Sequence, residues 1–206
     1  MREKYWLRST LITPTLILLS FFSVPESAYS NRLVNRAKIT IYYPIPNSAI
    51  TFKDSWEGIN GLKIAYYRLF RESILIGGAL DYSRFQIDQS KISFLDTKNH
   101  HINPSLYIGY HYSVSKWFSL LSSINIGYTW ILFRSEKFPE EAKEFDESGI
   151  SFEPGISLLY QVQEKVSVSI DASYKVIFEK FGEDNIGGED SSIRYLKLGI
   201  GFLLAF

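Results

Sequence analysis

The stretch YLKLGIGFLLAF, residues 195–206, alternates between two kinds of side chain. One face of this segment is uniformly large and apolar, whereas the other is mixed and includes Lys197, Gly199 and Gly201. The apolar face consists of Leu196, Leu198, Ile200, Phe202, Leu204 and Phe206. A period of two residues is typical of a β-strand whose two faces meet different surroundings. The fold therefore depends on which of the two faces meets water.

The same two-residue period recurs along the chain and predicts eight strands. The predicted strands cover residues 37–46, 59–70, 74–85, 102–114, 118–132, 150–162, 166–178 and 193–206. Strand 59–70 is the least regular, because Arg68 interrupts its apolar row. This interruption predicts a bulge or an early strand end at Arg68.

The connections between the predicted strands alternate in length. Tight turns are expected at residues 71–73, 115–117 and 163–165, and long polar loops at 47–58, 86–101, 133–149 and 179–192. Long and short connections that alternate around an even number of antiparallel strands are typical of an up-and-down barrel. With eight strands, both ends of the barrel chain lie on the side of the short turns.

The distribution of charge between the two faces decides which one points outward. In the last five predicted strands, counting the last from residue 195, the bulky face carries no Asp, Glu, Lys or Arg. The interior of an eight-stranded barrel has room for one set of side chains or one small ligand, so these large residues cannot all fit inside. An uncharged outward face is a liability in water and a requirement in lipid. The sequence therefore predicts an all-β, eight-stranded antiparallel transmembrane β-barrel.

Aromatic residues gather near both ends of the predicted strands. Amphipathic rings settle at the level of the lipid headgroups, so two aromatic belts are expected, although strands favour these residues in any case. The expected belts contain Tyr82, Tyr128, Trp130 and Tyr174 on the long-loop side, and Tyr110, Tyr112, Trp117 and Tyr160 on the short-turn side.

The first thirty residues have the three parts of a secretory signal peptide. Basic residues precede the apolar stretch STLITPTLILLSFFSV, and Ala28 and Ser30 place small residues before a cut ahead of Asn31. An uncleaved membrane anchor is the alternative, but this stretch is shorter than the roughly 20 residues of a spanning helix. We expect residues 1–30 to be removed and residues 31–206 to form the barrel.

The overall composition excludes several classes of partner and site. The chain has 22 acidic and 22 basic side chains, which gives no argument for nucleic acid as a partner. It has no cysteine, so disulfides, thiolate metal sites and acylation on cysteine are excluded.

The C-terminal stretch resembles the last strand of bacterial outer-membrane barrels, which commonly ends in Phe after alternating apolar residues and a glycine. Gly199, Phe202, Leu204 and Phe206 match that pattern, although Leu204 stands where an aromatic is more usual. In architecture the resemblance covers residues 31–206 and is closest to the small OmpA/OmpX-type proteins. It implies a monomer in the outer membrane of a diderm bacterium, with periplasmic termini and no cofactor. Its implied partners are the barrel-assembly machinery and outer-membrane lipid, including lipopolysaccharide.

The predicted inward face carries charges of both signs. They are Lys63, Lys175 and Lys197 against Asp81, Glu153 and Asp171. Because a buried charge is costly unless it is paired, these residues predict a salt-bridge network that plugs the lumen. A narrow polar path through the barrel is the alternative.

His111 and Ser113 form an H-x-S that resembles the motif of barrel lipid A deacylases, which pair it with an acid. Those enzymes have Asn after the Ser, whereas Val114 follows here. On strand geometry Glu153 lies near the opposite end of the barrel, and Asp171 is the closer acid. We therefore expect no enzymatic activity and keep a lipid A deacylase-like hydrolase as an alternative.

Two further features of the long loops suggest weaker interpretations. His100 and His101 are expected in a loop, where two adjacent histidines without a third ligand do not predict a metal site. The segments RSEKFPEEAKEFDES and EKFGEDNIGGED are acidic and are expected to be solvated, with divalent-cation bridging to anionic lipid or a basic partner as alternatives. The expected role is membrane integrity or surface interaction through four long loops.

Overall fold

The computed structural model describes residues 34–47, 55–70, 73–87, 97–135, 144–179 and 192–206. The predicted signal peptide, part of the predicted turn at 71–73 and the central parts of the four predicted long loops lie outside these residues. Within the described part of the chain, no helix is long and apolar enough to cross a membrane.

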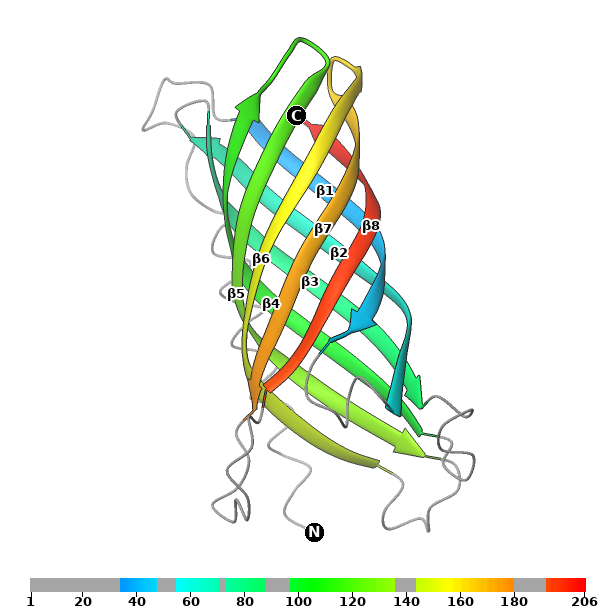
Figure 1. The fold of residues 1–206 in the computed structure, drawn as a ribbon. Coiled ribbons are helices and arrows are strands. Elements are labelled where there is room, and N and C mark those ends of the chain that lie inside the picture. The colour runs from blue at the N-terminus through cyan, green and yellow to red at the C-terminus, as the bar shows by residue number, and fades with distance from the viewer. Residues whose placement is uncertain (1–33, 48–54, 71–72, 88–96, 136–143, 180–191) are drawn as a thin grey trace. The chain divides into compact units, whose positions relative to one another are not determined.

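The structure is a closed antiparallel barrel of eight strands, as predicted (Figure 1). The strands are β1 (Val34–Pro46), β2 (Trp56–Phe70), β3 (Ile74–Ile87), β4 (Thr97–Ser113), β5 (Phe118–Ser135), β6 (Glu144–Gln163), β7 (Val166–Glu179) and β8 (Ser192–Ala205). Each strand pairs with its neighbours in sequence, and β8 closes the ring by pairing with β1. We call the end with residues 114–117, residues 164–165 and the C-terminus the short-turn end, and the opposite one the long-loop end.

Several strands extend further toward the long-loop end than the sequence predicts. β4 begins at Thr97 opposite Ser135 of β5, and β6 begins at Glu144 opposite Arg134. The predicted loops 86–101 and 133–149 are therefore wrong at their edges. The side chains there no longer alternate between apolar and polar, but the backbone ladder does not depend on that alternation.

The predicted bulge or strand end at Arg68 is also wrong. β2 stays in register there, with Asn35 of β1 on one side and Ile76 of β3 on the other, and continues to Phe70. The irregularity of β2 lies instead between Gly58 and Asn60. Arg68 is tolerated because it lies two residues from the strand end, where a long basic side chain can extend past the apolar band.

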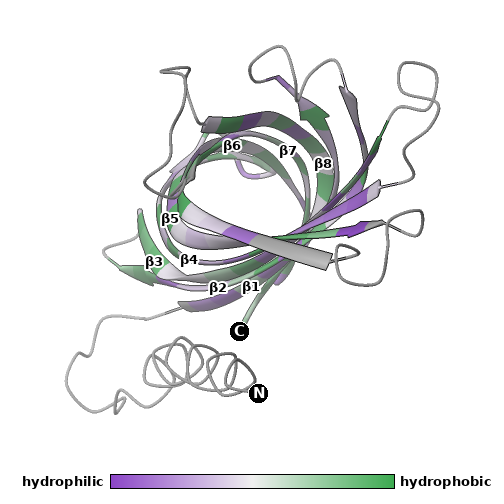
Figure 2. Cartoon of the chain, turned by 90° about the horizontal axis from the view of Figure 1, so that it is seen from below, coloured by the Kyte–Doolittle hydropathy of each residue, from purple (hydrophilic) through white to green (hydrophobic). Residues whose placement is uncertain are grey.

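The bulky face points outward, which confirms the prediction that decided the fold. Ile41, Ile170 and Ile200, near the middle of their strands, expose 66%, 69% and 64% of their surface. Residues of the opposite parity on the same strands face the interior, where Thr40, Ser169 and Lys197 are buried. Figure 2, a view along the barrel, shows how the strands enclose this interior.

All eight aromatic residues of the expected belts lie on the outer surface. At the short-turn end Tyr110, Tyr112, Trp117 and Tyr160 are exposed, and at the long-loop end Tyr128 is exposed while Tyr82, Trp130 and Tyr174 are half-buried. At the short-turn end Tyr160 contacts a further exposed ring, Phe118, and at the long-loop end two of the belt residues contact each other. The ring centroids of Phe118 and Tyr160 lie 5.1 Å apart, and those of Tyr128 and Trp130 lie 5.5 Å apart.

The interior contains two apolar clusters that the sequence analysis did not anticipate. Toward the short-turn end, Tyr67 and Tyr107 stack at 4.8 Å among Ala65, Leu75, Ala79, Leu121, Leu159 and Leu203. Toward the long-loop end, Phe85 and Tyr195 meet edge to face at 5.1 Å beside Ile131 and Ile177. Asp81, on β3 between Ala79 and Phe85, and Lys197, on β8 between Tyr195 and Leu203, lie between these two clusters.

Candidate functional site: a charged layer inside the barrel

Five charged side chains converge on the middle of the lumen from five different strands. They are Lys63 on β2, Asp81 on β3, Glu153 on β6, Lys175 on β7 and Lys197 on β8. Each lies on the inward face of its strand, so the barrel closure brings together residues that are far apart in sequence. Apart from Lys63, whose side chain is 14% exposed, none exposes more than 3% of its side chain. We call these five residues the charged layer.

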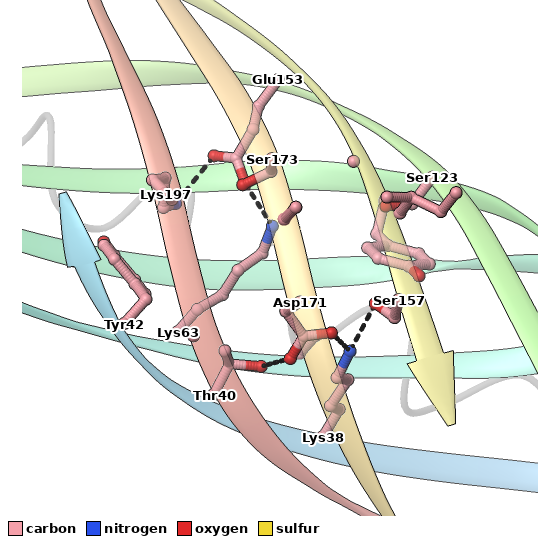
Figure 3. Close-up of a pocket in the computed structure, with 16 residues that line it drawn as sticks. Lys38, Thr40, Tyr42, Lys63, Ser123, Glu153, Ser157, Asp171, Ser173 and Lys197 are labelled. Carbon is pink, nitrogen blue, oxygen red and sulfur yellow. Dashed lines mark hydrogen bonds and ion pairs between the residues drawn. The ribbon is translucent and has the colours of Figure 1, made fainter. Parts of the chain in front are cut away.

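The five residues form one chain of alternating charges. The ammonium groups of Lys175 and Lys197 lie 2.7 and 2.8 Å from the same carboxylate oxygen, Oδ2 of Asp81. Lys197 also lies 3.0 Å from Oε2 of Glu153, and Lys63 lies 2.8 Å from Oε1 (Figure 3). Lys197 therefore links the two carboxylates, and the chain spans the lumen from β2 to β7.

Neutral side chains complete the hydrogen bonding of both carboxylates. The Tyr42 hydroxyl donates to Oδ1 of Asp81, and the Ser173 hydroxyl donates to Oε1 of Glu153 at 3.1 Å. The ammonium of Lys197 also lies over the Tyr42 ring, 4.2 Å from its centroid. Every carboxylate oxygen in the charged layer thus has a partner, which is the condition under which buried charges are tolerated.

Asp171 belongs to a second cluster, nearer the short-turn end. It accepts hydrogen bonds from Lys38, from Thr40 at 3.1 Å and from Ser169 at 2.9 Å. Lys38 donates a further bond to Ser157 at 2.8 Å. The structure therefore pairs Asp171 with Lys38, which the sequence analysis did not consider, although its position in β1 has the parity of the inward Thr40 and Tyr42.

A small cavity separates the two charged clusters. Lys38 and Asp171 line one side of it, and Lys63, Glu153 and Lys197 line the other (Figure 3). Tyr107 from the apolar cluster at the short-turn end also borders it. The lumen is thus divided into layers along its axis, and the cavity lies between two of them.

Proline residues interrupt the backbone ladder beside this interior. The pairing of β4 with β5 is regular as far as Ile102 opposite Trp130 and resumes at Ser105 opposite Gly127, on either side of Pro104. Proline has no N–H to donate to a ladder. The Asn103 side chain bridges the interruption by donating to the Thr129 hydroxyl at 3.0 Å.

A second interruption lies in the wall at Pro154. The pairing of β6 with β7 stops after Phe152 opposite Val176 and resumes at Gly155 opposite Ser173. Here Glu153 makes the bridge, through its bond from Ser173 and its 3.9 Å contact with Lys175. In both places an inward polar side chain joins strands where the backbone does not.

His111 and Ser113 are not assembled into a catalytic arrangement. His111 is half-buried on the inward face near the end of β4, and Ser113 is exposed at that end. Among the contacts between described residues, no carboxylate bonds to either side chain. The two acids that the sequence suggested are bound elsewhere, Asp171 by Lys38 and Glu153 by Lys63 and Lys197.

The placement of His100 and His101 in a loop is wrong, because both lie within β4. Successive residues of a strand point to opposite faces. His101 is buried inside against Phe85, whereas His100 points outward and its Nδ1 lies 2.7 Å from the Tyr82 hydroxyl. In the described part of the chain, no group of three or more His, Cys, Asp or Glu side chains could hold a metal ion.

Solved structures with a similar fold are outer-membrane barrels. The neisserial surface protein A, NspA, superposes with a TM-score of 0.55 at 14% identity, over 84% of this chain and 97% of NspA. Ail, the attachment invasion locus protein of Yersinia pestis, gives 0.50 at 15% identity, over 84% of this chain and 99% of Ail. A major outer-membrane protein of Thermus thermophilus gives 0.52 at 11% identity, over 82% of this chain and 99% of that protein.

No protein-family model matches the chain, and no curated protein matches it in sequence. At the identities found, the likeness to solved structures concerns the fold. The chain has the fold of the small eight-stranded outer-membrane β-barrels, as its C-terminal pattern predicts.

Proposed function

We propose that this chain is an integral outer-membrane protein without enzymatic activity, whose lumen is closed by its own side chains. Its long-loop end faces the cell exterior, its termini face the periplasm, and it acts as a monomer. It supports the membrane or contacts partners at the cell surface through its loops. The names of its structural neighbours, a surface protein and an attachment invasion locus protein, support a role at the surface.

The proposal of a closed lumen is based on the charged layer and on the apolar clusters on either side of it. An ion that crosses the barrel would have to break buried ion pairs such as Lys197–Asp81 and then pass the stacked rings of Tyr67 and Tyr107. Breaking a buried pair by removing one partner costs about 3–5 kcal/mol, which illustrates the size of such a barrier. These interior contacts are therefore better suited to stabilising the barrel than to transporting an ion.

Conductance in planar lipid bilayers tests the closed lumen. We expect the refolded protein to insert without discrete current steps. The informative variant is Lys197→Ala, because Lys197 links both carboxylates, and Lys116→Ala in the exposed turn is its control. Discrete openings in the unchanged protein that alter with Lys197→Ala but not with Lys116→Ala would refute the closed lumen.

The cavity between the two charged clusters favours a second candidate, a narrow channel. Lys38, Lys63 and Lys197 line this cavity together with Glu153 and Asp171, so an ion that entered it would meet one more positive than negative charge. A channel of this kind would prefer anions. Measured openings with anion selectivity would establish this candidate in place of the closed lumen.

Cell fractionation tests the proposed location separately from the state of the lumen. We expect the protein in the outer-membrane fraction, with its N-terminus processed before Asn31 and its folding dependent on the barrel-assembly machinery. Recovery of the folded protein from the soluble fraction without detergent would refute the location.

A further inference from the structure

The ion pairs around the cavity in the lumen leave one positive charge unbalanced. The charged side chains that line the cavity are three lysines and two carboxylates, Lys38, Lys63, Lys197, Glu153 and Asp171. The other two members of the charged layer, Lys175 and Asp81, pair with each other at 2.7 Å and do not change this excess of +1. A charge buried inside a protein is costly unless an opposite charge compensates it.

Neither Arg36 nor Glu147, which also have inward parity, removes the excess. Arg36 adds a positive charge on the short-turn side, two residues before Lys38, and its Nε has no hydrogen-bond partner among the described residues. Glu147 lies six residues from Glu153, about 20 Å along the strand, where it pairs with Ile131 of the apolar cluster at the long-loop end. The excess positive charge therefore stays at the cavity.

The same lysines carry spare hydrogen-bond donors. A lysine ammonium has three donors and no acceptor. Within the described part of the chain, Lys63 uses one donor, to Glu153 at 2.8 Å, and Lys38 uses two, to Asp171 and to Ser157. Both oxygens of Glu153 and both of Asp171 already accept a hydrogen bond. An acceptor with one negative charge would therefore satisfy both the spare donors and the excess charge.

The cavity has room for a small ion. Its volume of about 50 Å³ is several times the roughly 10–15 Å³ that one water requires by the same measure. The side chains of Lys38 and Lys63 approach it from β1 and β2 (Figure 3). The hydroxyl of Ser157, which accepts from Lys38, also lines the cavity and can donate its own hydrogen to an anion.

We propose that the cavity binds one small monovalent anion of the halide class, held by the ammonium groups of Lys38 and Lys63 and by the Ser157 hydroxyl. Hydrogen bonds between an ammonium group and an anion are about twice as strong as those between neutral groups. The anion brings the cavity and the charged layer together to neutrality. The inference goes beyond the proposed function, because an anion enclosed during folding is compatible with a closed lumen and with a narrow channel.

The dependence of stability on chloride tests the proposal. A ligand that binds only the folded state raises the ratio of folded to unfolded protein in proportion to its concentration, once that concentration exceeds its Kd. We expect about a tenfold rise in this ratio, for the purified protein in lipid vesicles, between about 10 and about 100 mM chloride. Sodium gluconate, whose anion is too large for the cavity, keeps the ionic strength constant. Lys63→Gln removes the excess charge but keeps a donor for Glu153, and should abolish the dependence.

The matched control is Lys116→Gln in the exposed turn, which should keep the full dependence on chloride. If heat-dependent gel mobility shows that Lys63→Gln is unfolded, Asp171→Asn replaces it. This variant raises the charge at the cavity to +2 and should bind chloride about tenfold more tightly, so that the dependence begins at about tenfold lower concentration.

Crystals grown in bromide locate the ion directly. We expect an anomalous signal beside Nζ of Lys63, which the Lys63→Gln variant should lack. The proposal is overturned by a stability that does not depend on chloride, by an unchanged dependence in the folded variant, or by crystals without bromide in the cavity. Conductance in planar bilayers tests the state of the lumen independently of these measurements.

Discussion

Replacing Asp81 with asparagine removes the residue that two buried lysines share. Three lysines and two carboxylates give the charged layer a formal charge of +1, and Asp81→Asn raises it to +2. Lys197 keeps Glu153 at 3.0 Å, but the nearest remaining carboxylate oxygen to Lys175 is 3.9 Å away. Lys175 is fully buried, so we expect the free energy of unfolding to fall by about 3–5 kcal/mol.

A second substitution should reverse part of this loss. Asp81→Asn combined with Lys175→Met restores the formal charge of the layer to +1, because it removes the lysine that the first change leaves without a close partner. The stability of both variants is measured by denaturant unfolding in lipid vesicles, followed by tryptophan fluorescence. The double-mutant cycle should give a coupling energy of about 1–3 kcal/mol.

Glu164→Gln, in the exposed turn between β6 and β7, is the control and should change stability by less than about 0.5 kcal/mol. The reasoning is refuted if Asp81→Asn costs no more than this control. It is also refuted if Lys175→Met adds its own full cost to that of Asp81→Asn, since the two residues would then not interact.

Three further predictions test the outer face, the interior and the chemistry of the barrel. Ile126→Arg places a charge in the middle of an outward row and should reduce stability in vesicles by about 2–4 kcal/mol, measured by the same unfolding assay; no loss would contradict a lipid-facing position. Gly61→Ala places a Cβ 2.1 Å from the Tyr42 ring, so we expect displacement of that ring from Asp81 and a lower unfolding midpoint, which Gly78→Ala on the outer face of β3 should not cause. Ser113→Ala should leave the acylation of lipid A unchanged, by mass spectrometry of cells that express either form; a loss of 3-linked acyl chains that depends on Ser113 would contradict the non-enzymatic proposal.

The fold could be predicted because the two-residue period and the outward face of a lipid-exposed barrel are both visible in its sequence. The alternation in residues 195–206 gives the period, and the absence of charge from the bulky rows gives the direction. The strand ends could not be predicted in the same way. Beyond the apolar band, residues such as Lys98 and Arg134 still pair through their backbones, but their side chains no longer alternate in polarity.

The interior could be predicted only in part. The parity of Lys63, Asp81 and Glu153 placed them inside, but their partners depend on how the ring of strands closes. Lys38 shares that parity, as does Arg36 on the same strand, but the pairing of Lys38 with Asp171 also depends on how the ring closes. Tyr67 and Tyr107 show the limit of an argument from volume, since two large rings fit inside when they stack.

Because two prolines interrupt the hydrogen bonding of the barrel wall, some side chains that fill the lumen also hold neighbouring strands together. At Pro104 and Pro154 neighbouring strands are joined by Asn103 and Glu153, side chains that also fill the interior. Removing these side chains to open a pore would therefore also weaken the contacts between β4 and β5 and between β6 and β7. A conducting variant would therefore have to replace both roles of these side chains.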